Sequence, residues 1–512
     1  MKTTTKICIL TLVACIGLTL FLGKSEAQQK PKDVLFVAQE DDVTTFDPSM
    51  STHVPNVTFY NVIYDCLTIF DNVEFTKLNP ALATSWNLIN PTTWQFKLRK
   101  GVTFHDGEPF NANTVKFNVE WLKTPGKHTV AGNFQTIDHA EVVDDYTINI
   151  ITKGPDSLLP KRLGAYGAQM TPPEYIKKVG RQTLNSKPIG TGPYIMKEWV
   201  KDDHVTLERN EKYWGEKGVF KEVIVKALPD NLTRLNAVLT GEVDLASMML
   251  PDQAAIVGSG NIARIESVLA AAQANYGFSC SKGPLKNKLV RQACNYAVDK
   301  DAILKKLWKG YGKVSTGSAI TYDFGYDPGL KPYPYDPAKA RELIKQAGYK
   351  PGEISFDLYA NAPGKELTEI VCAYLNDVGI NAQPKVLEAA TRARWQSDAY
   401  LWQGGVLFYP SSTLYDLDGS LWRTHGPKGA GANRWEEMNK PGMPFHDMME
   451  KARYSLNQEE RRKIYIEANK IFRDEAPVLF LFQYKILYGV NNRINYRPRP
   501  DERMYYNLIT FR

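Results

Sequence analysis

Apolar residues recur at every fourth position in the middle of the chain. The members of this repeat would share one face of a helix: Leu285, Leu289, Ala293 and Ala297. The Gly283-Pro284 pair before them is typical of a turn, and residues 275–279 before that turn are extended and partly aromatic. Asp299 can cap a second helix, which would end before Gly310. The pattern therefore predicts a strand, a turn and a helix pair.

The next hundred residues continue the alternation of helices and strands. Asp336 and Pro337 are typical of a helix start, and Gly348 of its end. A strand pattern at 354–359 and a helix pattern ending before Gly379 follow, and residues 380–388 are extended again. This order is typical of a layered α/β lobe.

The first part of the chain reads as strands and turns. Residues 33–39 form a short strand pattern, and the alternation of Trp94, Phe96 and Leu98 predicts a half-buried strand. Asp106-Gly107 is typical of a turn, and either Asn111 or Asn113 can cap the helix that follows.

Several of these stretches resemble the extracytoplasmic solute-binding proteins of family 5, which serve ABC importers of peptides, opines and nickel. The resembling motifs are PALATSW at 80–86, FKLRKGVTFHDGEPFNA at 96–112, GTGPY at 190–194 and NEKYW at 210–214. The pattern departs chiefly at Asn113, where the family usually has an acidic residue. The resemblance implies an α/β fold of the periplasmic-binding-protein type II, with two lobes joined by two crossover strands and an extra subdomain inserted in lobe 1.

The same resemblance implies a division of the chain into segments. They are a signal peptide at 1–27, lobe 1 at 28–58, the inserted subdomain at 59–185, lobe 1 again at 186–274, lobe 2 at 275–485 and a return to lobe 1 at 486–512.

The first 27 residues favour export. Lys2 and Lys6 precede an apolar run from residue 7 to 23, and Ser25-Glu26-Ala27 has small residues where a signal peptidase cuts. We expect a soluble periplasmic protein that begins at Gln28. A lipobox-like LVAC ending at Cys15 offers the alternative of a lipid anchor, but cleavage there would leave an apolar stretch as the new N-terminus.

Composition narrows the function classes. With 512 residues and 43% hydrophobic content, the chain can form several cores. The net charge is +7, and removing the leader, with three Lys and one Glu, leaves +5 (7 minus 2). No block of five like charges occurs, so a nucleic-acid partner is not expected. We expect a monomer.

Neither cysteine nor histidine spacing predicts a metal site or cofactor. Cys66, Cys280, Cys294 and Cys372 remain after the leader is removed, without a CxxC pair. Three complete disulfide pairings are open to them, although buried free thiols are expected at Cys294 and Cys372 on apolar helical faces. The seven histidines form no HxxxH or HExxH motif.

The aromatic segment 391–425 is the candidate ligand site. Aromatic side chains there could stack on a ligand, and Arg392 or Arg394 could hold a carboxylate. In peptide-binding relatives an acidic residue of this region pairs with the ligand amine, whereas here the sequence is Tyr-Pro-Ser-Ser unless Asp416 replaces it. Trp402 and Trp422 could equally belong to the core. The candidate ligand-binding residues are Thr45, Phe46, Arg394, Trp395, Trp402, Tyr409, Ser411, Ser412, Tyr415 and Asp416.

The resemblance implies a binding protein without catalysis. It would capture a small molecule between two closing lobes and deliver it to the permease subunits of an ABC importer. The Tyr-Pro-Ser-Ser loop favours an uncharged or anionic ligand over an ordinary free-amine peptide. A di- or oligopeptide or a nickel chelate is the alternative. A secreted hydrolase is more distant, because GxSxG is absent and His105-Asp106 belongs to a structural hairpin in the family.

Overall fold

The structure is a computed structural model that describes residues 31–388, 391, 395, 402–429 and 431–512. The predicted signal peptide, its alternative lipid site at Cys15, and both Arg392 and Arg394 lie outside these residues.

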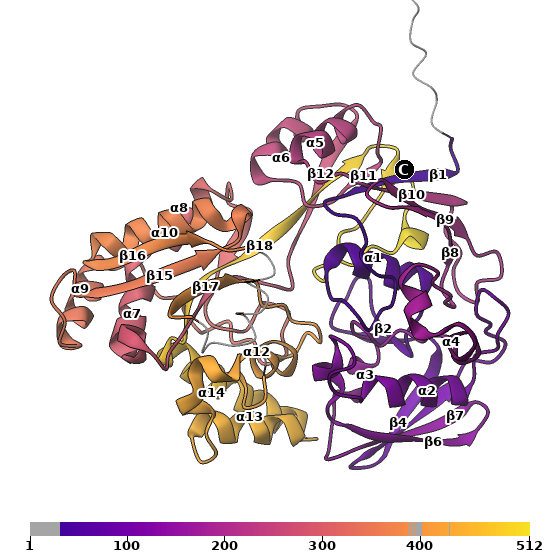
Figure 1. The fold of residues 1–512 in the computed structure, drawn as a ribbon, viewed down its shortest axis with the longest axis horizontal. Helices are drawn as coiled ribbons and strands as arrows, with labels where there is room; N and C mark the ends of the chain where they lie inside the picture. The colour runs from indigo at the N-terminus through magenta and orange to yellow at the C-terminus, as the bar shows by residue number, and fades with distance from the viewer. Residues whose placement is uncertain (1–30, 389–390, 392–394, 396–401, 430) are drawn as a thin grey trace, which may run out of the picture.

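One twelve-stranded sheet runs through both lobes (Figure 1). Its main path is β16-β15-β17-β13-β18-β11-β1-β10-β9-β8, and β12 and β14 also pair with β18. The strands of lobe 2 are β13 (Ala274–Phe278), β14 (Gly312–Val314), β15 (Ile354–Ala360), β16 (Ile380–Val386) and β17 (Gly404–Phe408). Those of lobe 1 are β1 (Val34–Gln39), β8 (Tyr194–Val200), β9 (His204–Arg209), β10 (Glu222–Ala227), β11 (Leu245–Ala246) and β12 (Ala263–Leu269).

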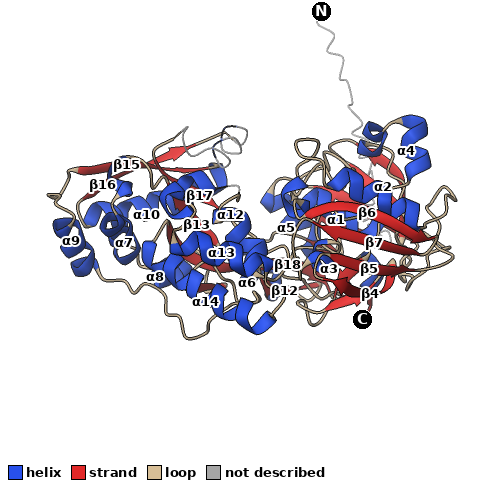
Figure 2. Ribbon diagram, turned by 90° about the horizontal axis from the view of Figure 1, so that it is seen from below, coloured by secondary structure: helices blue, strands red, loops and turns tan. Residues whose placement is uncertain are grey.

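The long strand β18 (Val478–Asn491) joins the two lobes (Figures 1 and 2). Its first half pairs with β13 and β14, and its second half pairs with β12 and β11. The chain therefore passes from lobe 1 to lobe 2 at residues 270–273 and returns at 484–485; we call these the crossover segments. The expected type II fold with two crossovers is confirmed.

Lobe 2 contains the helices that the apolar periodicity predicts. They are α7 (Lys288–Ala297), α8 (Lys300–Lys306), α9 (Pro337–Gln346) and α10 (Lys365–Asp377). Two further helices follow in lobe 2, α13 (Pro444–Tyr454) and α14 (Gln458–Glu475). The Asp299 carboxylate caps α8 by accepting from the Ala302 N–H at 2.9 Å. The helix α7 begins later than its repeat suggests, because Leu285 lies in the 3-10 turn Gly283–Lys286 that Pro284 starts.

The inserted subdomain has its own four-stranded sheet in the order β4-β5-β7-β6. Its elements are β2 (Thr68–Phe70), β3 (Leu78–Pro80), β4 (Ala83–Asn90), β5 (Thr93–Leu98), α2 (Ala112–Leu122), β6 (Ile137–Asp144), β7 (Thr147–Thr152), α3 (Leu159–Arg162) and α4 (Pro173–Val179). Asn111 caps α2, and Phe96 and Leu98 point into a core separate from those of the lobes. The hairpin around Asp106-Gly107 contacts lobe 1 through His105, whose Nε2 lies 3.0 Å from Gly192 O. Burial lowers the pKa of His105 to about 4.

Lobe 1 is completed by helices and by the end of the chain. Its helices are α1 (Val54–Ile63), α5 (Asn231–Leu239) and α6 (Pro251–Gly258). After β18, residues 492–512 return along lobe 1 with the short strands β19 (Ile494–Asn495) and β20 (Thr510–Phe511). Tyr496, Met504 and Tyr506 join the core of lobe 1, so this return segment is an integral part of that lobe.

Candidate functional site

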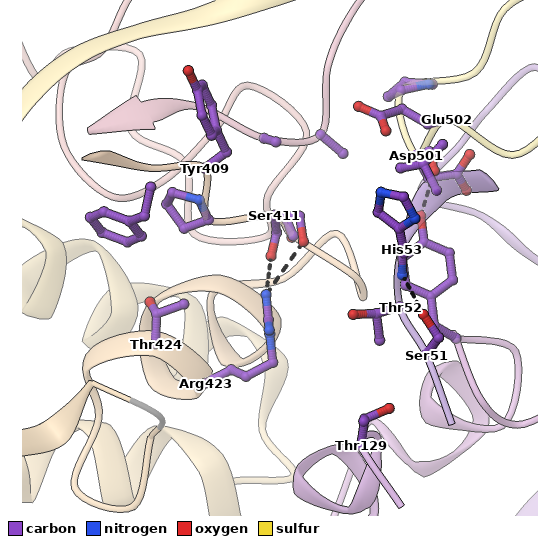
Figure 3. A pocket seen from close by; sticks show the side chains of 18 of the residues that line it. Ser51, Thr52, His53, Thr129, Tyr409, Ser411, Arg423, Thr424, Asp501 and Glu502 are labelled. Carbon is purple, nitrogen blue, oxygen red and sulfur yellow. Dashed lines mark hydrogen bonds between the residues drawn. The ribbon is translucent and has the colours of Figure 1, made fainter. Parts of the chain in front are cut away.

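A cavity of about 770 Å³ lies between the lobes beside the crossover segments (Figure 3). Lobe 1 contributes residues 50–54 and lobe 2 contributes residues 408–412 and Arg423, while the return segment contributes residues 500–502. The volume falls within the range of about 300–1,000 Å³ that is usual for small-molecule sites. This cavity is the candidate ligand site.

The lobe 2 wall is the loop that follows β17. Ser411 forms a β-bridge with Ala272, and the Ser412 N–H donates to Ala271 O at 2.7 Å. These bonds hold the loop against the first crossover segment. Tyr409, 38% exposed, leans edge-on against Tyr484 of β18, with ring centroids 5.8 Å apart. The wall therefore presents the Tyr409 ring and the Ser411 side chain to the cavity.

Arg423 supplies the cation of this wall. It begins the short helix α12 (Arg423–His425), and its guanidinium donates to Gly419 O at 2.8 Å and to Ser411 O at 2.7 Å. Burial lowers its pKa, and no carboxylate of the described residues forms an ion pair with it. The two carbonyl bonds fix the guanidinium while leaving its charge uncompensated, an arrangement suited to an anionic ligand group.

The facing wall belongs to lobe 1 and is polar. Ser51, Thr52, His53 and Thr129 lie along it (Figure 3). The His53 N–H donates to Ser51 Oγ at 3.1 Å, and the imidazole lies 3.6 Å from Asp41. These side chains can donate or accept hydrogen bonds, so this wall can orient a polar ligand.

A third part of the lining is acidic. Glu40 follows β1, and Asp501 and Glu502 belong to the return segment. Asp501 is neutralised by Arg499 at 2.8 Å and Arg503 at 3.6 Å. Glu502 has no such partner among the described residues; burial, the charge of Glu40 and that of Asp501 raise its pKa to about 8.

The lobes also meet beside the cavity. Arg162 of α3 donates to Asp418 of lobe 2 at 2.7 Å and to Asp156 of its own subdomain at 2.9 Å. All three side chains are at most 3% exposed. Burial opposes ionisation of Asp418, but Arg162 and Arg453 outweigh it and lower its pKa to about 2. This buried inter-lobe ion pair shows that the lobes are closed on each other.

Three of the sequence-predicted residues line the cavity, namely Tyr409, Ser411 and Ser412. Ser412 is only 2% exposed and its hydroxyl donates to Asp323 Oδ1, so its side chain is engaged on the side away from the ligand space.

Four other predicted residues lie away from the cavity lining. Thr45 Oγ1 donates to Asn185 Oδ1 at 2.6 Å, and Phe46 is fully buried against Phe59 and Trp199. Trp402 is 4% exposed and donates from Nε1 to Trp395 O at 2.9 Å, while the Trp395 ring contacts Tyr359. Their local partners, rather than the ligand space, occupy these side chains. Trp422 is also in the core of lobe 2.

Tyr415 and Asp416 are placed inside the protein. Tyr415 is 1% exposed and packs on Phe70. Both carboxylate oxygens of Asp416 accept from Arg461, at 2.6 and 2.7 Å, and the two side chains are 1% and 0% exposed. The sequence left open that Asp416 takes the place of the family's acidic residue that pairs with the ligand amine. In the structure the Asp416 carboxylate is paired with Arg461 instead and does not line the cavity.

The residues that the sequence reasoning did not select come from distant segments. Arg423 lies within the aromatic segment, where its basic character was a usable signal. Glu40, His53 and Glu502 carry no motif, and only the folding of lobe 1 brings them to one cavity.

Other chemistry is limited in the described part of the chain. Cys66, Cys280, Cys294 and Cys372 are buried free thiols, so none of the three disulfide pairings is present. No group of three or more His, Cys, Asp or Glu side chains among the described residues is arranged to hold a metal ion. Within those residues, no helix is both long and apolar enough to span a membrane.

The chain matches the model of the bacterial extracellular solute-binding proteins, family 5 (middle region), over residues 77–422. It is 31% identical over 457 residues to the glutathione-binding protein GsiB of Pectobacterium atrosepticum, covering 87% of each chain.

Solved structures give the same result. The periplasmic binding protein DppA of Helicobacter pylori, in complex with the peptide STSA, is 25% identical with a TM-score of 0.81, over 93% of this chain and 98% of that one. NikZ of Campylobacter jejuni, in complex with Ni(L-His), is 25% identical with a TM-score of 0.79, over 91% of this chain and 95% of that one.

Proposed function

This chain belongs to the bacterial extracellular solute-binding proteins of family 5, the substrate-binding components of ABC importers, and we propose that its ligand is a small molecule held by a carboxylate. Arg423 would bind that carboxylate between the closed lobes.

The uncompensated guanidinium of Arg423 carries this proposal. The Arg423 guanidinium is half-buried and has lost part of its hydration, so a cation there without a counter-ion is unfavourable and a ligand carboxylate would offset that cost. Ser411 O and Gly419 O already fix the side chain, so little rotational freedom is lost on binding. Arg434 adds positive potential from the same side of the cavity, where it lies 5.0 Å above the Phe408 ring.

The ligands of the related proteins have one chemical group in common. Glutathione, the peptide STSA and histidine in Ni(L-His) each carry a carboxylate. We therefore place this chain's ligand among peptide-like or amino-acid-derived molecules. The Tyr-Pro-Ser-Ser sequence at 409–412 favoured uncharged or anionic ligands, and an Arg423 anchor supports the anionic alternative.

Calorimetry tests the carboxylate anchor directly. Glutathione and a panel of tripeptides are titrated in free-acid form and as C-terminal amides, the glutathione derivative being amidated at both carboxyl groups. We expect at least one free acid to bind at micromolar Kd, about −8 kcal/mol, and amidation to weaken it by about tenfold or more. Arg423→Met should have the same effect on the free acid. Exposed Arg462→Met is the matched control.

Equal affinity of acids and amides, or full affinity in Arg423→Met, would contradict the proposal. Recovery of the ligand unchanged after incubation tests our further proposal that the protein binds without catalysis.

Family 5 binding proteins act in the bacterial periplasm and deliver small molecules to ABC permease subunits. We propose that this chain reaches the periplasm through cleavage after Ala27 rather than lipidation at Cys15, and that it acts as a monomer without nucleic acid. The separate cores of the inserted subdomain and the lobes support the proposed segment division, except that Phe59, Val62, Ile63 and Tyr64 belong to the core of lobe 1, so the subdomain begins after residue 64 rather than at 59.

A further inference from the structure

The cavity has charge of opposite sign on different walls. Arg423 comes from lobe 2, whereas Glu40 and Glu502 come from the end of β1 and the return segment of lobe 1. Figure 3 shows Glu502 well separated from Arg423 across the cavity. A ligand that reaches both walls would therefore meet a cation at one end and carboxyl groups at the other.

The acidic wall is not neutralised by the protein. The two arginines beside it, Arg499 and Arg503, are engaged with Asp501. Glu40 accepts from Ser247 Oγ at 3.0 Å. Arg234 feels the charge of Glu40 but forms no ion pair with it, and its guanidinium donates to Leu228 O at 2.6 Å and Pro229 O at 2.9 Å.

Within the described part of the chain, the groups that act on Glu502 are neutral or negatively charged. The Tyr484 hydroxyl hydrogen-bonds to it, Tyr488 of β18 feels its charge, and Glu40 and Asp501 repel it. Two further groups of the cavity lining, His53 and Tyr166, complete the titratable surroundings. The position of Glu502 is fixed by an unusual backbone conformation, φ +61°, that few non-glycine residues adopt.

The lobe 2 loop offers no competing acid. Its positions 411 and 412 are serines, Asp416 is paired with Arg461, and Asp323 is enclosed by Ser412 and Ser420. A ligand ammonium in this cavity can find a free carboxyl partner only on the lobe 1 side among the described residues.

We propose that Glu40 and Glu502 form an ammonium subsite, so that the protein takes zwitterionic peptide-like solutes with the amine toward the return segment and the carboxylate toward Arg423. This inference rests on the proposed function and narrows its substrate class. It also reverses the expectation that a free amine is disfavoured. The carboxyl group that would bind the amine belongs to Glu502, which lies 90 positions after Ser412 of the serine loop.

The subsite predicts a proton exchange on binding. With a pKa of about 8, Glu502 holds a proton at pH 7 in the empty site. An ammonium beside it favours the carboxylate, so binding releases that proton to the buffer. Affinity for a zwitterion should therefore rise between pH 6 and 8, over about the range in which Glu502 loses its proton.

Calorimetry in two buffers of different ionisation enthalpy measures this proton directly. The probes are glutathione, trialanine and their N-acetyl derivatives, used with the mature protein at pH 7. We expect N-acetylation to weaken binding by about tenfold or more and to abolish proton release. Glu502→Gln should abolish the proton release that accompanies binding of a free-amine ligand, because the released proton is that of Glu502. Glu40→Gln should weaken the affinity for the same ligand. Exposed Glu216→Gln is the control.

The outcomes separate the two proposals. N-acetyl ligands that bind as tightly as free amines, still in an Arg423-dependent way, would overturn the ammonium subsite and leave the carboxylate anchor intact. Failure of every free-amine probe to bind overturns the subsite as well. Loss of discrimination between acids and amides, with the amine still required, overturns only the anchor. A Glu502→Gln variant that releases the same proton contradicts the role of Glu502.

Discussion

Asp416→Asn should damage the stability of lobe 2 rather than ligand recognition. The Asp416 carboxylate makes two bonds to Arg461, and the pair is almost wholly excluded from water. Removing one partner of a buried ion pair costs about 3 to 5 kcal/mol, since the remaining charge is left uncompensated. Arg461 would keep its bonds to Ala452 O at 3.1 Å and to the Tyr465 hydroxyl at 3.4 Å, and the Asn amide oxygen could still accept, but the charge of Asp416 that neutralises it would be lost.

For a lobe of about 200 residues, that loss corresponds to a fall in Tm of about 6 to 20 °C. Thermal unfolding followed by circular dichroism measures it, with calorimetric ligand affinity determined on the same preparation at 10 °C. The double variant Asp416→Leu with Arg461→Met removes both charges and should recover much of the loss, because well-packed apolar residues often replace such pairs without destabilisation.

The opposite result would refute this reasoning. If Asp416→Asn kept its Tm and lost affinity for free-amine ligands, the carboxylate would belong to the ligand rather than to Arg461.

Three further predictions concern the lobes, the thiols and the pH dependence. Asp418→Asn removes the negative charge that pairs with Arg162 across the lobes, so the ligand-free protein should have a larger radius of gyration by small-angle scattering. An unchanged radius would show that the ion pair does not hold the lobes together. In the mature protein the four thiols should not react with a thiol reagent until denaturant is added, and four equivalents should then react. The reason is that burial raises the pKa of Cys66, Cys294 and Cys372 to about 12 and that of Cys280 to about 11. Reaction of only two equivalents would indicate a disulfide. The fold favours neutral His105, so its contribution to the free energy of unfolding should be fully present above the unfolded-state pKa of 6.5 and be lost as the pH falls toward the folded-state pKa of about 4. The urea midpoint should therefore fall over this pH range. An equal fall in a His105→Gln variant would show that His105 is not its origin.

The sequence by itself determined the local elements and the family. Caps and stops such as Asp299 and Gly379 act on their own neighbours, so the helices that they delimit could be placed from the sequence alone. The hairpin motif at 96–112 indicated the family because its turn and strand are formed within one short stretch. Tyr409, Ser411 and Ser412 could be placed at the cavity for the same reason, since they directly follow a recognisable strand, β17.

Only the tertiary structure decided which charged side chains line the cavity and which are paired inside the protein. Asp416 and Glu502 are both acidic residues in loops, and nothing in their own neighbourhoods distinguishes them. Arg461, 45 positions after Asp416, takes one carboxylate into a buried pair, whereas the return of the chain along lobe 1 brings the other beside Glu40. A charge is neutralised by whatever the fold places within a few ångströms of it, and that distance is not encoded in local sequence.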